Sequence, residues 1–100
     1  MMKLTGKQAR YLRGLGHHLQ AVVMIGKEEL TDTVVTATDE ALASHELIKV
    51  KLQDGCLSDR RELAAELAQA TSASVAQVLG RTFLLYRKHP ENPQISLPKP

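Results

Sequence analysis

The spacing of hydrophobic positions changes along the chain between helical and strand periods. Apolar residues three and four positions apart predict helices over residues 5–16, 31–44 and 58–70. Runs that are apolar throughout, or apolar at every second position, predict strands over residues 21–25, 46–52, 74–79 and 82–87. The step Gly80-Arg81 fits a tight hairpin turn between the last two strands. The pattern therefore predicts a single α/β domain of order α-β-α-β-α-β-β with a four-stranded mixed sheet.

The pattern within each strand also predicts its place in the sheet. Residues 21–25 are apolar without interruption, which predicts burial on both faces and a central position. In residues 46–52, Lys49 and Lys51 alternate with apolar residues, which predicts one wet face and a position near the sheet edge. A helix joins these two strands, so they should be parallel. We therefore expect the spatial order third, fourth, first and second strand.

Composition supports a globular domain followed by a short tail. The chain is 43% hydrophobic, which favours a packed core over disorder. Residues 1–88 form the predicted domain, and residues 89–100, which hold all 4 prolines, form a predicted flexible C-terminal tail. No apolar stretch is long enough to span a bilayer, and no signal segment begins the sequence. We therefore expect a cytoplasmic protein without membrane contact.

Charge is unevenly distributed along the chain. Residues 28–48 carry Asp and Glu but no Lys or Arg, so the second predicted helix is acidic. Residues 1–27 carry no Asp or Glu, and the first helix presents a basic stripe opposite its leucines. This asymmetry favours a polyanion on the basic side, with ordinary solvated surface as the alternative. The basic residues of this segment are Lys3, Lys7, Arg10, Arg13 and Lys27.

No residue pattern indicates catalysis, a metal site, a cofactor or a small-molecule substrate. The neighbours His17 and His18 cannot point the same way on a helix, so they make a poor metal site. His45 and His89 have no ligand spacing to them, and the single cysteine excludes an internal disulfide. The sequence therefore predicts a binding protein, and hydrolysis of RNA through His17 or His18 is the most distant alternative.

Gly26 and Lys27 follow the first predicted strand and precede a helix N-terminus. Such a loop attracts anions through free main-chain N–H groups, and Lys27 adds a positive charge. A plain strand-to-helix turn is the alternative. Aromatic residues are few, and Tyr11 and Phe83 are predicted to lie in the core, which argues against stacking of bases. The pattern therefore favours recognition of an RNA backbone.

Several motifs follow one another over about residues 3–88. They are Leu4-Thr5-x-Lys7-Gln8-x-x-Tyr11-Leu12-Arg13, His17-His18-Leu19, Val22 to Lys27, Asp39-Glu40-Ala41-Leu42, His45 to Lys51, Gln77 to Arg81 and Leu85-Tyr86-Arg87. In these motifs and their order the chain resembles the bacterial YhbY-type, or CRM-domain, RNA-binding proteins.

The resemblance implies a fold similar to the C-terminal domain of the third translation initiation factor. It also implies association with precursors of the large ribosomal subunit, and no catalysis. The family's Gly-x-x-Gly loop would bind RNA here through Gly26 and Lys27, but Glu29 stands in place of the second glycine. A glutamate repels phosphate and disfavours the positive φ that a glycine permits.

The sequence thus predicts a non-enzymatic RNA-binding protein that assists assembly of the large ribosomal subunit, with ribosomal RNA or its precursor particle as partner. The alternative is a protein-interaction module that docks a ribosomal protein through the acidic second helix. The predicted RNA-binding residues are Gly26, Lys27, Lys3, Lys7, Arg10, Arg13, Lys49, Lys51, Arg81 and Arg87.

Overall fold

The computed structural model describes residues 3–100, so Met1 and Met2, which begin the predicted domain, lie outside the described residues. The chain forms an α/β domain in the predicted element order, with three helices and a four-stranded mixed sheet. The elements are α1 (Gly6–Gly16), β1 (Ala21–Ile25), α2 (Asp32–His45), β2 (Leu47–Leu52), α3 (Arg60–Ala70), β3 (Ser74–Leu79) and β4 (Thr82–Tyr86).

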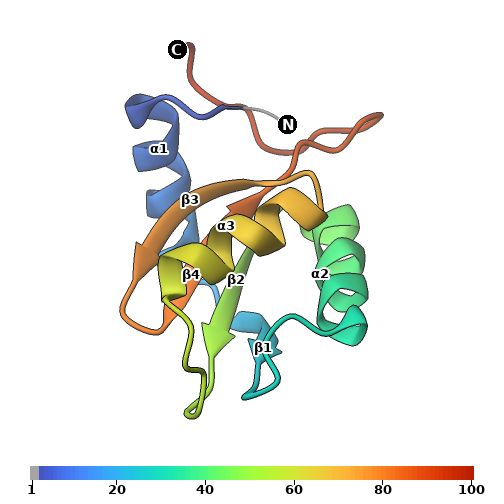
Figure 1. The fold of residues 1–100 in the computed structure, drawn as a ribbon. Helices are drawn as coiled ribbons and strands as arrows, with labels where there is room; N and C mark the ends of the chain where they lie inside the picture. Colours follow the sequence, from blue (N-terminus) through green and yellow to red (C-terminus); the bar gives the residue numbers. More distant parts are fainter. Residues whose placement is uncertain (1–2) are drawn as a thin grey trace.

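Helices cover both faces of the sheet (Figure 1). On one face, Leu42 of α2 and Leu67 of α3 are buried against the strands in the larger hydrophobic cluster. On the opposite face, Leu12 of α1 packs against Leu84 and Tyr86 of β4 in a smaller cluster. The two clusters arise because alternate side chains of each strand point to opposite faces.

The strand order is β1-β2-β4-β3, which differs from the predicted order. β2 lies inside the sheet between β1 and β4, and β1 is an edge strand whose Val22 and Met24 are 54% and 50% exposed. The expectation of a central β1 and a β2 near the edge is therefore wrong. Lys49 is half-buried and Lys51 is exposed although β2 is paired on both sides, so their alternation reports a wet face of the sheet and not an edge position.

The pairing directions agree with the sequence. β1 and β2 are parallel, whereas β4 is antiparallel to both β2 and β3. Gly80 has φ +57° in the turn between β3 and β4, a conformation that a glycine adopts without steric cost. The predicted hairpin and the predicted parallel pair are both confirmed.

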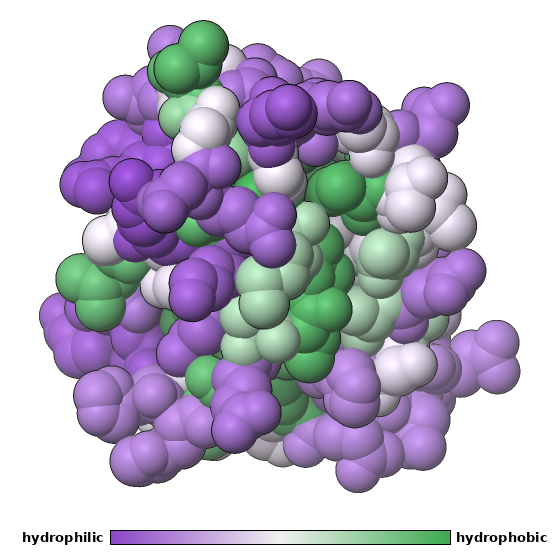
Figure 2. All heavy atoms as spheres, turned by 90° about the horizontal axis from the view of Figure 1, so that it is seen from below, coloured by the Kyte–Doolittle hydropathy of each residue, from purple (hydrophilic) through white to green (hydrophobic). Residues whose placement is uncertain are grey.

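Three loops gather at the end of the sheet where β1, β2 and β3 finish. The N–H of Leu52 donates to the carbonyl of Arg81 at 2.7 Å, and the N–H of Gln53 donates to the carbonyl of Ile25 at 2.8 Å. Figure 2 views this end of the molecule and shows apolar surface in the middle of largely hydrophilic surroundings. The residues after β1, after β2 and after β3 therefore form one surface.

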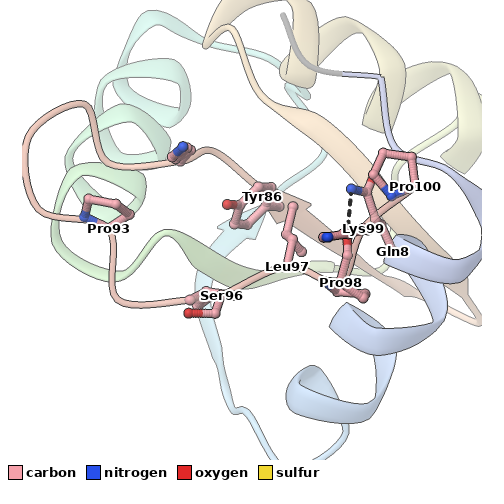
Figure 3. Close-up of a pocket in the computed structure, with 10 residues that line it drawn as sticks. Gln8, Tyr86, Pro93, Ser96, Leu97, Pro98, Lys99 and Pro100 are labelled. Atoms are coloured by element: carbon pink, nitrogen blue, oxygen red, sulfur yellow. Dashed lines mark hydrogen bonds between the residues drawn. The ribbon is translucent and has the colours of Figure 1, made fainter.

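The predicted C-terminal tail contains no helix or strand and lies on the α1 side of the sheet. Ile95 and Leu97 pack against the cluster that contains Tyr86, and the side-chain Nε2 of Gln8 donates to the carbonyl of Pro98 at 3.0 Å (Figure 3). A hollow of about 420 Å³ remains between this segment and the domain. The segment thus covers part of the sheet, and its flexibility stays a prediction.

Glu46 holds the C-terminal segment in place. It follows α2 with φ +56°, and its buried carboxylate accepts hydrogen bonds from the N–H groups of His89 at 2.9 Å, Gln94 at 2.6 Å and Ile95 at 3.0 Å. Burial alone would raise the pKa of Glu46, but these three N–H groups and the nearby His89 outweigh it and lower the pKa.

We predict that acid releases the C-terminal segment. The pKa of Glu46 is lower in the folded protein than in the unfolded chain, so its carboxylate stabilises the fold above the unfolded pKa. That contribution begins to be lost as the pH falls below the unfolded pKa of a glutamate, about 4.3, and is gone once the pH has fallen through the lowered folded pKa. Hydrogen-exchange protection of the Gln94 and Ile95 amides should therefore fall in this range.

Substitution at position 46 gives the matched test. Glu46→Gln should remove the protection at neutral pH and destabilise the fold by about 1–3 kcal/mol, because the N–H groups would no longer have a charged acceptor. Glu91→Gln, at an exposed site in the same segment, is the control and should change neither quantity. Unchanged protection in Glu46→Gln would show that the packing of Ile95 and Leu97 alone holds the segment.

We also predict opposite effects of alanine at two helical glycines of α1. A Cβ at Gly16 would lie 2.5 Å from Cδ1 of the buried Leu84, whereas a Cβ at Gly14 would meet nothing within 4 Å. Gly14→Ala should stabilise the protein by up to ~1 kcal/mol through helix propensity. Gly16→Ala should destabilise it by about 1–3 kcal/mol, because Leu84 must repack. Denaturant unfolding of both variants measures the difference, and equal stabilities would place α1 farther from β4.

Candidate functional site

The loop after β1 places Lys27 at the exposed end of a tight turn. The carbonyl of Gly26 accepts the N–H of Glu29 at 2.9 Å, which closes the turn. Thr31 then caps α2, because its hydroxyl accepts the N–H of Val34 at 3.1 Å. Lys27 therefore lies next to the N-terminal end of α2, where the helix dipole adds to its positive charge.

Glu29 has a positive φ, a backbone conformation that the sequence predicts to be unfavourable for a glutamate. Its φ is +61°, and its carboxylate accepts the N–H of Leu57 at 3.1 Å, the N–H of Ser58 at 2.9 Å and the hydroxyl of Ser58 at 2.6 Å. A glutamate is disfavoured at this φ relative to a glycine, and the three hydrogen bonds offset that cost and hold Glu29 there. Leu57 contributes only its main chain to this contact.

These contacts tie the loop after β1 to the loop after β2. The Ser58 hydroxyl, followed by the N–H groups of Ser58 and Leu57, lowers the pKa of Glu29, so the residue is ionised at neutral pH. The thiol of Cys56 donates to the carbonyl of Gly26 at 3.1 Å and lies 3.3 Å from the carbonyl of Ile25. The Gly26-Lys27 turn is therefore held at two points and is not an isolated loop.

Other basic residues join Lys27 at this end of the sheet. Lys51 is exposed near the end of β2, and Arg81 in the β3–β4 turn pairs with Asp54 at 2.8 Å. Sequence reasoning missed Arg60 and Arg61, the first residues of α3. They line a hollow of about 360 Å³ together with Arg81, and Nη1 of Arg60 donates to the carbonyl of Gly80 at 3.2 Å.

The signal for Arg60 and Arg61 is present in the sequence. Asp59 is the N-cap of α3, with its carboxylate accepting the N–H groups of Arg61 at 2.7 Å and Glu62 at 3.3 Å. A helix that begins directly after an Asp cap, a few residues beyond a strand, brings its first side chains to the carboxyl end of that strand. The cap and the preceding strand together would have placed both arginines in this surface.

The basic stripe of α1 is exposed, with one member outside the helix. Lys7, Arg10 and Arg13 lie on the solvent side of α1. Lys3 precedes the N-cap Thr5 and lines a hollow beside α3 and β3. Three of the four predicted cations therefore form a surface on α1, and Lys3 lies at its margin.

Arg87 lies apart from the other predicted residues. Its Nη1 donates to Oδ1 of Asp39 at 2.6 Å and to the carbonyl of Thr71 at 2.8 Å, and its Nη2 donates to the carbonyl of Asp39 at 3.1 Å. Its side chain is 24% exposed. The structure therefore uses Arg87 to join α2 to the end of α3 and does not bring it to the three loops.

The sheet separates the two signs of charge. α1 and β1 contain no Asp or Glu, and Lys49 and Lys51 of β2 point to the same face as α1. The opposite face is covered by α2, which carries Asp32, Asp39 and Glu40, and by α3, whose Glu62 and Glu66 are balanced by Arg60 and Arg61 at its start. The face of the sheet next to α1 is therefore basic, and the charge asymmetry of the sequence becomes an asymmetry in space.

The aromatic side chains are distributed differently from the prediction. Phe83 is buried as expected, and Tyr86 is buried as well. Tyr11, which was expected in the core, is 42% exposed on α1. Tyr11 is the neighbour of the fully buried Leu12 in α1. Because α1 buries only a narrow part of its surface, the Tyr11 side chain stays outside the core.

Other kinds of site find no support among residues 3–100. His17 and His18 are exposed, with their ring centroids 4.9 Å apart in an edge-to-face contact. Within this described part of the chain, no group of three His, Cys, Asp or Glu side chains is arranged to hold a metal ion. Nor does any described helix have the length and apolar character needed to cross a membrane.

Comparison with known proteins gives a consistent result. Residues 4–87 match the sequence model of the CRS1 / YhbY (CRM) domain. The chain is 39% identical over 95 residues to the Bacillus subtilis protein named "Probable RNA-binding protein YqeI", covering 95% of this chain and 99% of the relative. It is 37% identical over 99 residues to a Haemophilus influenzae protein named "RNA-binding protein", covering 99% of each.

A solved structure has the same fold. The solution structure of SAV1595 from Staphylococcus aureus superposes with a TM-score of 0.83 at 40% sequence identity, covering 96% of this chain and 100% of that one. The β1-β2-β4-β3 sheet with its three helices is therefore shared with this relative.

We predict that Glu29 keeps the two loops together. Glu29→Ala should accelerate hydrogen exchange at the Leu57 and Ser58 amides and lower the melting temperature, because the carboxylate that accepts their N–H groups is removed. Glu28→Ala is the matched control, since Glu28 is the neighbouring exposed glutamate, and its exchange at these amides should equal that of the parent protein. Equal exchange in both variants would contradict a structural role of the Glu29 carboxylate.

Proposed function

Because the chain belongs to the CRS1 / YhbY (CRM) domain family, we propose that it is a non-catalytic cytoplasmic RNA-binding protein that associates with precursors of the large ribosomal subunit. The named relatives are described as RNA-binding proteins, which supports RNA as the partner. Contacts to phosphates would come from Lys27 and the main chain at Gly26, with α1 supplying Lys7, Arg10 and Arg13.

The separation of charge across the sheet is the observation that carries this proposal. The exposed cations of α1, with no Asp or Glu on α1 or β1, attract phosphates over a distance and release their counterions on contact. The hydrogen bonds of Glu29 to Leu57 and Ser58 support the same proposal. Glu29 stands where the family's loop has its second glycine, and these bonds direct its carboxylate to the loop after β2. Arg60 and Arg61 extend the positive surface beyond α1.

The alternative is docking of a ribosomal protein on acidic α2. Its support is weaker, because the carboxylate of Asp39 is already paired with Arg87 at 2.6 Å. The exposed acidic residues Asp32 and Glu40 remain on α2 for a basic partner. Removal of their charges should leave binding to protein-free RNA intact and should weaken binding to a ribosomal protein, so protein-free RNA separates the two proposals.

We predict that charge reversal on α1 weakens RNA binding. Arg10→Glu with Arg13→Glu should reduce affinity for a structured fragment of large-subunit ribosomal RNA. It should also reduce the slope of log affinity against log salt by about 0.7–0.9 for each phosphate that the variant no longer neutralises. Fluorescence anisotropy over a salt series measures both quantities. The fold should persist, because both side chains are exposed.

The matched control changes net charge by the same amount elsewhere. Lys88→Glu with Lys99→Glu places the new charges on exposed residues outside α1, one directly after Arg87 and one in the C-terminal segment, and the salt slope should stay close to that of the parent protein. Equal slopes for the two double variants would show that only net charge matters. Cosedimentation of the parent protein with ribosomal precursors tests the second half of the proposal, and its absence from these particles would reject an assembly role.

A further inference from the structure

Four side chains form a row across the sheet at the end where the loops gather. Lys51 of β2 pairs with Met24 of β1 on one side and with Thr82 of β4 on the other, and Thr82 pairs with Leu79 of β3. Paired residues on neighbouring strands point to the same face. We call these four residues the open row.

The open row lies on the α1 face but beyond the end of α1. Leu84, two residues after Thr82 and therefore on the same face, meets α1 at Gly16, the last residue of the helix. No element covers the next row, and Met24 and Leu79 are 50% and 64% exposed. The sheet therefore presents an uncovered strip with an apolar side chain at each end and Lys51 between them.

We propose that the open row binds unpaired bases of single-stranded RNA. The inference rests on the proposed function. The Gly26-Lys27 turn and α1 would contact phosphates only, and the open row would contact the bases. Four strands at the usual spacing make a strip about 14 Å wide, which gives a flat support for the faces of bases. Thioether and leucine side chains pack against such faces, and methionine is polarizable enough to do so without an aromatic ring.

The charges around the open row favour a nucleic acid over a protein. Lys51 lies within the row, Lys27 follows the β1 end, and Arg81 follows the β3 end. None of the four side chains in the row is acidic, and because Arg81 is paired with Asp54, Lys51 and Lys27 supply the net positive charge here. A ribosomal protein of basic character would be repelled here, whereas a strand whose bases lie on the row would have its phosphates within the surrounding positive surface.

The composition of the sequence argued against base stacking because aromatic residues are few. The inference departs from this conclusion, because Met24 and Leu79 offer exposed apolar contacts at the two ends of the row without an aromatic ring. Single-strand binding usually combines a positive groove with a surface for base faces. The open row supplies the second component next to the loop that supplies the first.

The test compares three RNA probes of equal length. They are a single-stranded oligouridylate of about ten nucleotides, a ribose-phosphate strand without bases, and a blunt duplex. The parent protein should bind the oligouridylate more tightly than the baseless strand, by about two- to tenfold for a base that packs on the thioether of Met24. Met24→Ser with Leu79→Ser should remove most of this preference while leaving binding of the baseless strand unchanged.

Leu57→Ser is the matched control. Leu57 is a 96% exposed apolar residue at the same end of the molecule, but it lies in the loop after β2, outside the open row. This variant should keep the full preference for bases. All three replaced side chains are exposed, so the melting temperatures should match, and a 2-aminopurine in the oligonucleotide reports base contact with the unsubstituted protein independently of any variant.

The outcomes separate this inference from the proposed function. Equal affinity of the parent protein for strands with and without bases would overturn the open row as a base-binding site and would leave RNA binding intact. Failure to bind any of the RNA probes or the structured ribosomal fragment would overturn both. A self-associating parent protein that Met24→Ser with Leu79→Ser makes monomeric, with base preference unchanged, would assign the row to contact between copies and overturn the inference.

Discussion

The length of α1 decides which parts of the sheet are covered. With 11 residues the helix spans about 16 Å, which is too short to cross its face of the sheet completely. Gly16 allows the last turn to approach Leu84 closely, and the chain then turns away toward β1. On this face, one end of the sheet is covered by the C-terminal segment and the other end is left open. The basic surface and the open row both follow from this incomplete cover.

Two glutamates, Glu29 and Glu46, combine a positive φ with a carboxylate that accepts hydrogen bonds from another segment of the chain. Glu29 and Glu46 both have a positive φ, which a glycine would adopt more easily, and both accept main-chain N–H groups from distant segments. Glycine at either position would relieve the backbone but would leave those N–H groups without the carboxylate. The unusual backbone and the long-range hydrogen bonds are therefore parts of one arrangement, in which the side chain compensates for its own conformation.

The element order could be predicted from sequence because each helix and strand has a strong local period. The strand order could not, because the alternation of Lys49 and Lys51 reveals a wet face without revealing which strands lie beside it. At the site, Lys27 follows from a local motif and is found at the predicted turn. The contact between Glu29 and Ser58 joins residues 29 apart, and no local pattern reports it. The contacts of Arg87 to Asp39 and Thr71 are also distant in sequence, so its charge suggested a surface role without revealing these partners.

The central place of β4 has a consequence for the order in which the protein can form. β4 comes after the other three strands in residues 3–100, yet it lies between β2 and β3, and Arg87 directly after it joins α2 to α3. A nascent chain that ends before Thr82 therefore has the parallel pair β1–β2 and an isolated β3, each with unpaired main-chain groups along an edge. The sheet closes only through contacts that are distant in sequence, which are slow to form. Until synthesis has passed residue 87, the apolar strands of the emerging chain are exposed to pairing with other chains, because the sheet that protects them has not yet formed.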